Sequence, residues 1–303
     1  MKTAEGKPAG TLAIFGVGMI GGSLARALRQ ANACDRIIGY GRSPANLQRA
    51  LDLGVIDQAL TDAASAATAA DVIVLASPLA TTEPLLRQIR DALGQDTIIT
   101  DVGSAKGCIV EAARRALKPG QLRNLVPGHP IAGKEKSGVD HAHPDLFKDH
   151  LVILTPVPET DPAQLRRIRR LWELVGARVV EMEVSTHDAI LAATSHLPHM
   201  LAYALVDCLA RSRESEEIFK YAAGGFADFT RIASSNPEMW HDICLANRDN
   251  LLVMLDRFRG HLDEIRAAIL HNDGRPLLEI FTRAKQARDD FINRFPGRNH
   301  GPE

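Results

Sequence analysis

The sequence predicts an α/β Rossmann-type nucleotide-binding domain followed by an all-α domain. Apolar runs alternate with amphipathic segments as far as about residue 183, and a glycine-rich G-x-G-x-x-G segment directly follows the first of these runs. Beyond residue 185 only segments with helical periodicity follow. Continuous apolar strands separated by helices are typical of a parallel sheet covered on both faces. We therefore expect residues 1–183 to bind a dinucleotide and residues 184–303 to form a helical domain.

The first domain is expected to contain strands with helices between most of them. The predicted strands are short apolar runs at 12–15, 36–40, 71–76, 97–101, 122–126, 151–155 and 178–183. The predicted helices are amphipathic segments at 20–30, 45–53, 82–93, 107–117 and 163–175.

The second domain is expected to consist of helices broken at three places. These breaks are marked by turn-forming residues at Gly224-Gly225, Asn236-Pro237 and Asn272-Asp273-Gly274. The segment from Leu251 to Leu270 is long and apolar for a helix. An apolar helix of this kind suggests that the chain dimerises.

The overall composition argues against several classes of partner. Lys and Arg total 36 against 37 Asp and Glu, so no net basic field attracts nucleic acid. The longest apolar runs are too short to span a membrane, and the polar N-terminus does not resemble a signal peptide. We expect a cytoplasmic protein with scattered, reduced and mostly buried thiols at Cys34, Cys108, Cys208 and Cys244.

The glycine-rich segment has the spacing of a dinucleotide fingerprint. It runs Gly16-Val17-Gly18-Met19-Ile20-Gly21, after a predicted strand and at the start of a predicted helix. Such glycines allow a tight turn and a close approach of the backbone to pyrophosphate, which the helix N-terminus then binds. Ser77 and Pro78 follow the third predicted strand and are expected to line the same cofactor.

The residues after the second strand favour NADP over NAD. An NAD site usually has an acidic residue about 20 positions beyond the glycines, where it binds the ribose 2′-hydroxyl. Here Gly41 occupies that place, and Arg42 and Ser43 follow it. A guanidinium and a hydroxyl can bind a 2′-phosphate that a carboxylate would repel. The alternative is that Arg42 stacks on adenine and the site accepts NAD.

Two polar side chains are predicted to lie near the nicotinamide. Ser104 follows the fourth strand, and His129 lies in a Gly/Pro-rich loop after the next one. Ligands of open α/β sheets bind at the carboxyl ends of the strands. An imidazole there can accept a hydroxyl proton while hydride leaves the same carbon. The alternative is a structural role for His129; the pair His141 and His143 is expected to be solvated.

Two clusters in the helical domain suit an anionic substrate. His196 and His199 are three positions apart around Pro198, so they share one helix face. Zinc would need a third ligand, such as His187 or Asp188, but the spacing fits no metal motif, so no metal is expected. The alternative to substrate binding is that the two histidines are buried and structural. Arg231 can grip a carboxylate in a bidentate manner. The alternative is an ion pair between Arg231 and Asp228.

These motifs together resemble those of the prephenate/arogenate (cyclohexadienyl) dehydrogenase family. The resemblance covers about residues 11–295. It is carried by Gly16-Val17-Gly18-Met19-Ile20-Gly21-Gly22-Ser23, Asp101-Val102-Gly103-Ser104-Ala105-Lys106, Gly128-His129-Pro130-Ile131-Ala132-Gly133, Ser195-His196-Leu197-Pro198-His199, and Gly225-Phe226 with Asp228-Phe229-Thr230-Arg231-Ile232-Ala233.

The resemblance implies a homodimer that oxidatively decarboxylates prephenate or arogenate, to 4-hydroxyphenylpyruvate or tyrosine, with hydride transfer to NAD(P)+. It implies that His129 bonds the ring 4-hydroxyl with support from Ser104. It also implies that His199 and Arg231 hold the carboxylates of the substrate. Further substrate-binding positions that it implies are His196, Glu135, Asp228 and Trp240. Lys134 departs from the family pattern, and its charge would mildly repel the ammonium of arogenate, which favours prephenate.

Two rival interpretations make different predictions. Another two-domain dehydrogenase, such as a 3-hydroxyacid dehydrogenase or a pyrroline-carboxylate reductase, predicts a catalytic Lys in the helical domain. After Ser185 the only lysines are Lys220 and Lys285, and neither lies in a recognisable motif. A non-enzymatic NAD(P)-sensing module would explain the glycines but not the occurrence of His129, His199 and Arg231 in one chain.

Overall fold

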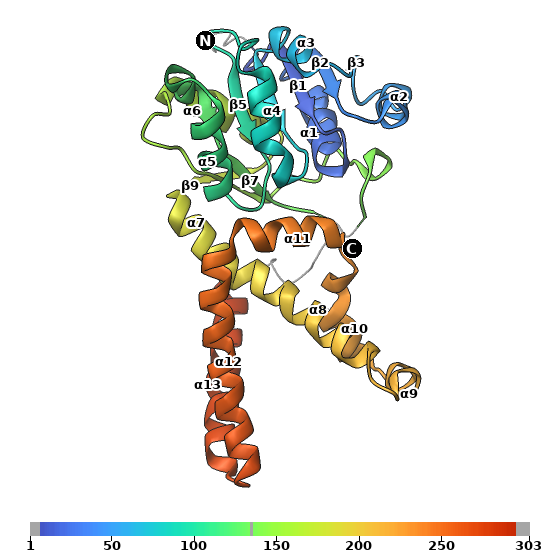
Figure 1. The fold of residues 1–303 in the computed structure, drawn as a ribbon, viewed down its shortest axis with the longest axis vertical. Coiled ribbons are helices and arrows are strands. Elements are labelled where there is room, and N and C mark those ends of the chain that lie inside the picture. Colours follow the sequence, from blue (N-terminus) through green and yellow to red (C-terminus); the bar gives the residue numbers. More distant parts are fainter. Residues whose placement is uncertain (1–6, 134–135, 295–303) are drawn as a thin grey trace. The chain divides into compact units, whose positions relative to one another are not determined.

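The computed structural model describes residues 7–133 and 136–294. Its chain divides into two compact units, Met1–Arg248 and Asp249–Glu303 (Figure 1). The first unit contains both sheets and the helices up to residue 246, and the second contains the last two long helices.

A six-stranded parallel sheet forms the centre of the first unit. Its spatial order is β3-β2-β1-β4-β5-β6, so successive strands are added on one side of β1 as far as β3 and on the other side from β4. The order of the strands therefore reverses between β1 and β4. A doubly wound sheet binds ligands beyond the carboxyl ends of its strands at such a reversal. The strands are β1 (Thr11–Phe15), β2 (Arg36–Tyr40), β3 (Gln58–Leu60), β4 (Val72–Leu75), β5 (Ile98–Asp101) and β6 (Leu125–Val126).

Helices cover both faces of this sheet, as the sequence predicted. Alternate residues of β1 point to opposite faces: Leu12 and Ile14 join one hydrophobic cluster, and Ala13 and Phe15 join the other. The helices of this part are α1 (Met19–Gln30), α2 (Pro44–Asp52), α3 (Ala63–Thr68), α4 (Thr82–Ile89), α5 (Gly107–Ala116) and α6 (Pro162–Leu174).

The last predicted strands form a sheet of their own, which the sequence analysis did not foresee. β7 (Gly128–Ile131) pairs antiparallel with β8 (Leu151–Leu154), which pairs parallel with β9 (Arg178–Glu181). The expected strand 122–126 is shorter, because residues up to Asn124 belong to the 3-10 helix η2 (Pro119–Asn124). Pro127 separates β6 from β7, and proline lacks the N–H that would continue a ladder.

Beyond β9 the described chain contains helices and no strand, and the three predicted breaks are confirmed. α10 begins at Gly224, α11 begins after its N-cap Asn236, and α13 begins at Gly274. The elements are α7 (Val184–Leu191), the π-helical η4 (Ala192–His196), α8 (Leu197–Ala210), α9 (Ser215–Lys220), α10 (Gly224–Thr230), η5 (Arg231–Ser234), α11 (Pro237–Ala246), α12 (Arg248–Leu270) and α13 (Gly274–Arg294).

The change from α/β to all-helical chain comes at α7, but the first compact unit continues to Arg248. The two carboxylate oxygens of Asp188 in α7 accept hydrogen bonds from the backbone N–H groups of Lys106 and Gly107. These bonds tie the first helix of the helical part to the nucleotide-binding part. A domain boundary between residues 183 and 184 stays a prediction.

Candidate active site

The glycine-rich loop after β1 has the geometry of a phosphate cradle. Gly16 has a φ of 103°, and a Cβ there would lie 2.6 Å from the Ala76 carbonyl oxygen. A Cβ on Gly21 would lie 2.4 Å from the Gly16 carbonyl oxygen, whereas one on Gly18 would meet nothing within 4 Å. Gly16 and Gly21 therefore permit close backbone packing, and Gly18 leaves open space beside the loop.

The N-terminus of α1 opens into this loop. Gly18 is the N-cap and has no side chain with which to cap the helix, so the first-turn N–H groups around Met19 and Ile20 suit an anion. Asn46 at the start of α2 donates from Nδ2 to the Val17 carbonyl oxygen at 2.9 Å. These residues fit the pyrophosphate of a dinucleotide.

The residues predicted to select the cofactor lie at the end of β2. Arg42 is exposed. The Ser43 hydroxyl caps α2 by accepting a hydrogen bond from the Asn46 N–H at 3.3 Å. A Cβ on Gly41 would make only ordinary contact with Leu47, at 3.6 Å. Gly41 is therefore not required by the local packing, and its small size leaves room beside Arg42.

Ser77 and Pro78 follow β4, on the edge of the sheet to which the glycine loop also belongs. The Ser77 hydroxyl lies 2.8 Å from the Thr81 hydroxyl, which donates to the Pro78 carbonyl oxygen at 2.7 Å. The 3-10 turn η1 (Leu79–Thr81) packs against α11, the helix that carries Trp240. The predicted cofactor loop therefore contacts a predicted substrate helix.

A buried ion pair lies at the carboxyl end of β5. Asp101 and Lys106 are almost fully buried and form a salt bridge. The Lys106 ammonium also donates to the Gly128 carbonyl oxygen at 2.7 Å, and Asp101 accepts from the Gly128 N–H at 3.1 Å. The pair therefore bonds both the N–H and the C=O of Gly128, the residue immediately before His129.

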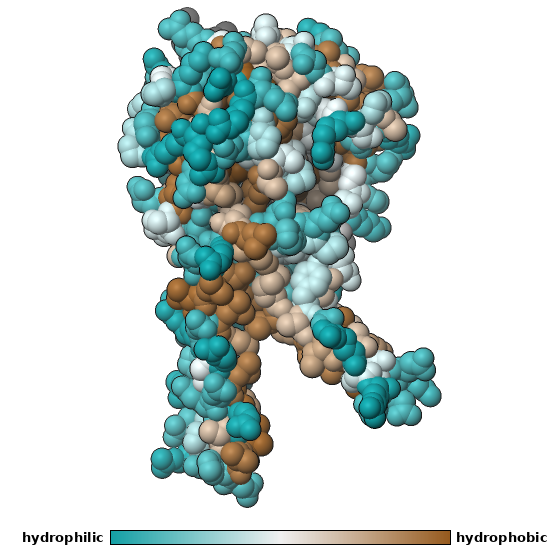
Figure 2. All heavy atoms as spheres, in the orientation of Figure 1, coloured by the Kyte–Doolittle hydropathy of each residue, from teal (hydrophilic) through white to brown (hydrophobic). Residues whose placement is uncertain are grey.

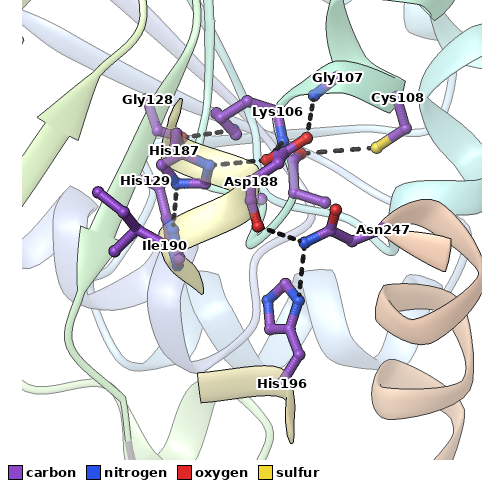
Figure 3. A network of polar contacts seen from close by, with 12 residues as sticks. Lys106, Gly107, Cys108, Gly128, His129, His187, Asp188, Ile190, His196 and Asn247 are labelled. Carbon is purple, nitrogen blue, oxygen red and sulfur yellow. Dashed lines mark hydrogen bonds and ion pairs between the residues drawn. The ribbon is translucent and has the colours of Figure 1, made fainter. Parts of the chain in front are cut away.

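His129 is the first member of a chain of buried side chains (Figure 3). Its Nδ1 lies 2.9 Å from Nε2 of His187, and Nδ1 of His187 lies 2.7 Å from a carboxylate oxygen of Asp188. A carboxylate only accepts hydrogen bonds, so Nδ1 of His187 carries a proton and its Nε2 accepts one. It follows that Nδ1 of neutral His129 is the donor, which leaves Nε2 of His129 with the lone pair.

Asn247 extends this cluster to His196. Its Nδ2 donates to the Asp188 backbone carbonyl oxygen at 2.8 Å and lies 3.1 Å from Nδ1 of His196 (Figure 3). An amide nitrogen is a donor, so Nδ1 of His196 accepts and Nε2 carries the proton. Nε2 of His196 and Nε1 of Trp240 are both buried without a hydrogen-bond partner among the described residues.

Burial keeps His129 and His196 neutral. It lowers the pKa of His129 well below the usual 6.5, and the nearby charge of Lys106 lowers it further. It lowers the pKa of His196 to about 4, which Asp188 partly counteracts. Burial alone would raise the pKa of Asp188, but hydrogen bonds from His187 and the backbone of Lys106 and Gly107 outweigh it and lower that pKa.

His199 and Trp240 form a second small group. Their rings stack with centroids 3.7 Å apart and an angle of 22°, and the His196 ring meets the same tryptophan edge-on at 6.0 Å. His196 and His199 therefore do share one face, as predicted. The Nδ1 of His199 lies 2.8 Å from the Ser195 carbonyl oxygen. A carbonyl oxygen only accepts hydrogen bonds, so Nδ1 of His199 carries the proton of the neutral ring and its Nε2 is an acceptor.

The remaining predicted residues lie outside the buried cluster or at its edge. Arg231 begins η5, which packs against α8, the helix that carries His199. Asp228 is exposed on α10. Ser104 is half-buried between Asp101 and Lys106, and its backbone raises the pKa of His196 slightly against the effect of burial. Lys134 and Glu135 lie outside the described residues.

Two expectations about local structure need correction. His129 lies inside strand β7 rather than in a loop, because Gly128 to Ile131 pair with β8.

The thiols are also less uniformly buried than expected: Cys34 is buried, Cys108 and Cys244 are half-buried, and Cys208 is exposed. Burial raises the pKa of Cys108 to about 12, which disfavours a nucleophilic thiolate there. His141 and His143 are exposed, as expected.

Sequence reasoning missed several members of the buried cluster. His187 and Asp188 were considered only as zinc ligands, and Lys106 and Asn247 were given no role. The adjacent acidic and basic side chains of His187-Asp188 at the start of a helix were the available signal. Their pairing with His129 spans 58 residues, so no local pattern reveals it.

Two family models match the chain. One is the nucleotide-binding domain of prephenate dehydrogenase, over residues 24–181, and the other is its dimerization domain, over residues 183–283. A cyclohexadienyl dehydrogenase from Zymomonas mobilis is 37% identical over 91% of this chain and 94% of its own length. A prephenate dehydrogenase from Bacillus subtilis is 37% identical over 95% of this chain and 77% of its own length.

Solved structures agree with these matches. Prephenate dehydrogenase from A. aeolicus, in complex with hydroxyphenyl propionate and NAD+, has a TM-score of 0.87 and 38% identity over 93% of this chain and 98% of that one. Arogenate dehydrogenase from Synechocystis has a TM-score of 0.77 and 29% identity over 93% of this chain and 100% of that one. The chain therefore belongs to the prephenate dehydrogenase family of NAD(P)-dependent oxidoreductases.

Proposed function

We propose that this enzyme oxidatively decarboxylates prephenate to 4-hydroxyphenylpyruvate, in tyrosine biosynthesis, and that arogenate is its second substrate. The observation that carries the proposal is the buried, neutral His129, whose Nε2 lone pair is left available by the bond from Nδ1 to His187. A neutral imidazole is the group that this reaction needs, because the 4-hydroxyl must lose a proton as its carbon loses hydride.

The reaction then requires little beyond positioning. A dinucleotide held by the glycine-rich loop would supply the acceptor for the hydride that leaves ring carbon C4. His129 takes the 4-hydroxyl proton, so a C4 carbonyl forms, and Ser104 stabilises that oxygen. The electrons of the bond between C1 and its carboxylate flow into the ring as CO2 leaves. The carbonyl oxygen regains the proton from His129 and becomes the phenol, so no net proton is consumed.

Residues of the helical part are proposed to hold the anionic substrate. His199 and Arg231 bind its carboxylates, and the stack on Trp240 fixes the His199 ring at 3.7 Å. His196, Asp228 and Glu135 are proposed to complete the polar surroundings of Arg231. The positive charge of Lys134 favours the keto acid prephenate over the ammonium of arogenate.

We infer that the cofactor is NADP rather than NAD, on the strength of exposed Arg42 and the absence of an acid at position 41. The test is a pair of variants. Arg42→Ala should raise the KM for NADP+ at least about tenfold, the loss of roughly one charge-assisted bond, and change that for NAD+ little. Gly41→Asp should shift preference toward NAD+. Equal effects on both cofactors would contradict the inference.

A cytoplasmic homodimer is the proposed form of the enzyme. Apolar side chains gather on the surface of the helical part (Figure 2). The segment Val184–Ala210 is long and apolar enough to cross a membrane, and 28% of its apolar 18-residue window is buried. The matched dimerization domain includes this segment, so we propose that a second copy covers it rather than lipid.

The proposed activity can be tested with four assays. Prephenate and arogenate are each incubated with NAD+ and NADP+, and reduced nicotinamide is followed by its absorbance. We expect the highest kcat/KM for prephenate with NADP+. Absence of turnover in all four assays would overturn the proposal, and turnover with a 3-hydroxyacid or an imine alone would favour another two-domain dehydrogenase.

A further inference from the structure

We propose that His187 and Asp188 are positioning residues that select the tautomer of His129. The inference rests on the proposed function, since only a base with a free Nε2 gives the selection a purpose. His129 comes from β7 and the other two residues from α7, yet their side chains form one continuous hydrogen-bonded chain (Figure 3). Neither residue is proposed to touch the substrate.

The direction of the chain follows from its fixed end. Asp188 accepts hydrogen bonds at 2.8 Å from the Lys106 N–H on one carboxylate oxygen and from the Gly107 N–H on the other. These backbone donors stabilise the carboxylate and hold its orientation. His187 is fully buried, and with its Nδ1 proton bonded to Asp188 only Nε2 is left to meet His129.

Two other placements of the protons can be compared with this one. If Nε2 of His187 carried the proton, its Nδ1 lone pair would face the Asp188 carboxylate at 2.7 Å, and two acceptors would oppose each other in a buried site. A doubly protonated imidazole at position 187 would make His129 Nδ1 the acceptor and place the proton on His129 Nε2, which the nitrogen measurement below distinguishes from the proposed arrangement.

Asp188→Asn tests the inference, because the amide has the same shape but only one acceptor oxygen. In either orientation its nitrogen faces the backbone N–H of Lys106 or Gly107, so the side chain no longer holds the Nδ1 proton of His187 and the tautomer of His129 is no longer selected. We expect kcat to fall about 10²–10⁴-fold, the scale for a mispositioned acid–base group, while the KM values for substrate and dinucleotide change little. A substrate carrying deuterium at C4 should then show a larger isotope effect on kcat, because chemistry becomes rate-limiting.

The chain offers a matched control. His241 and Asp242 are also adjacent, with Nδ1 3.1 Å from the carboxylate, but His241 is exposed on α11. Asp242→Asn makes the same chemical change and should leave kcat within about twofold of the parent enzyme, because its histidine partner is exposed rather than part of the buried cluster. Asp188→Glu should recover part of the lost kcat, because a carboxylate again selects the tautomer.

The tautomer itself can be measured without turnover. In protein labelled with ¹⁵N-histidine, the parent enzyme should show His129 with a protonated Nδ1 and a pyridine-like Nε2, assigned by its loss in His129→Gln. Asp188→Asn should populate the other tautomer, with a proton on Nε2 of His129. A parent enzyme with a pyridine-like Nδ1, or Asp188→Asn with the kcat of Asp242→Asn, would overturn the inference. Failure of the proposed function would instead appear as no turnover by the parent enzyme.

Discussion

The histidines of the buried cluster differ in what burial does for them. Burial keeps His129 neutral by lowering its pKa well below 6.5, and a neutral imidazole is the form that can accept a proton. The same burial leaves His196 with a bonded Nδ1 and, among the described residues, an unpartnered Nε2–H. Burial thus keeps both imidazoles neutral, with the lone pair on Nε2 in His129 and the proton on Nε2 in His196.

His129→Asn should separate chemistry from binding. Asparagine can keep a hydrogen bond to His187 but cannot accept the substrate proton. We expect kcat to fall about 10²–10⁴-fold, the usual contribution of a positioned acid–base group. Dinucleotide affinity, measured by quenching of protein fluorescence, should change little. Near-normal turnover would remove His129 from the proposed role.

The low pKa of His196 should make stability depend on pH. Its folded pKa of about 4 lies below the usual 6.5, so between these values the unfolded chain binds more protons and stability rises with pH. The contribution is complete above pH 6.5 and is lost as pH falls toward 4. Thermal melts should lose about 2–4 °C per pH unit in this window for each such group.

A matched variant identifies the group responsible. His196→Gln removes the titration but keeps a side chain that can bond Asn247, so its melting temperature should vary less between pH 6.5 and 4. Parallel curves for the variant and the parent enzyme would assign the acid sensitivity to other groups, of which His129 is the first candidate.

At the scale of elements, the ion pair of Asp101 and Lys106 joins two sheets. Asp101 ends β5 of the parallel sheet, and both partners bond the peptide of Gly128 at the start of β7. The pair thereby fixes the first residue of β7 relative to the end of β5, and with it the position of the next residue, His129. Both side chains are buried, so neither can be removed without leaving a charge behind.

Lys106→Met should therefore destabilise the fold strongly. Breaking a buried pair leaves an uncompensated charge and costs about 3–5 kcal/mol, whereas breaking the exposed pair of Lys118 and Asp91, at 2.8 Å, should change the stability far less because solvent screens it. Urea unfolding of Lys106→Met and Lys118→Met compares the two. The double variant Asp101→Asn/Lys106→Met should recover part of the loss. Equal costs for the two single variants would contradict this account.

Elements with a strong local signal could be predicted, and those set by distant partners could not. The glycine loop and α1 follow from adjacent residues, as do the helix starts at Asn236 and Gly274. β3 has only three residues, all half-buried. A segment this short does not reveal the alternation of apolar and polar residues that marks a strand. β7 contains a proline and exists because β8 pairs with it. The same limit hid the partners of His129, which come from a helix far along the chain.

For the whole molecule, the apolar surface of the second unit needs a partner. In the described residues of α12 and α13, several large apolar side chains are more than half exposed: Val253, Ile269, Leu270, Leu278 and Phe281. A soluble monomer rarely exposes so many neighbouring apolar groups. The family match to a dimerization domain over residues 183–283 includes most of this surface.

Charges placed on this surface should dissociate the proposed dimer. Leu278 and Phe281 are 68% and 57% exposed and share one face of α13 because they are three residues apart. We expect Leu278→Lys/Phe281→Lys to elute as a monomer in size-exclusion chromatography with light scattering. Gln286→Lys adds a charge at a polar position of the same helix and should stay dimeric. A double variant that remains a dimer would place the interface elsewhere.

The link between β7 and α7 has a consequence for the order in which this enzyme matures. The cradle at Gly16 closes through contacts within the first 77 residues. The orientation of the imidazole at position 129 requires the chain as far as residue 188. Since synthesis runs from the N-terminus, the base can be oriented only after α7 has been made.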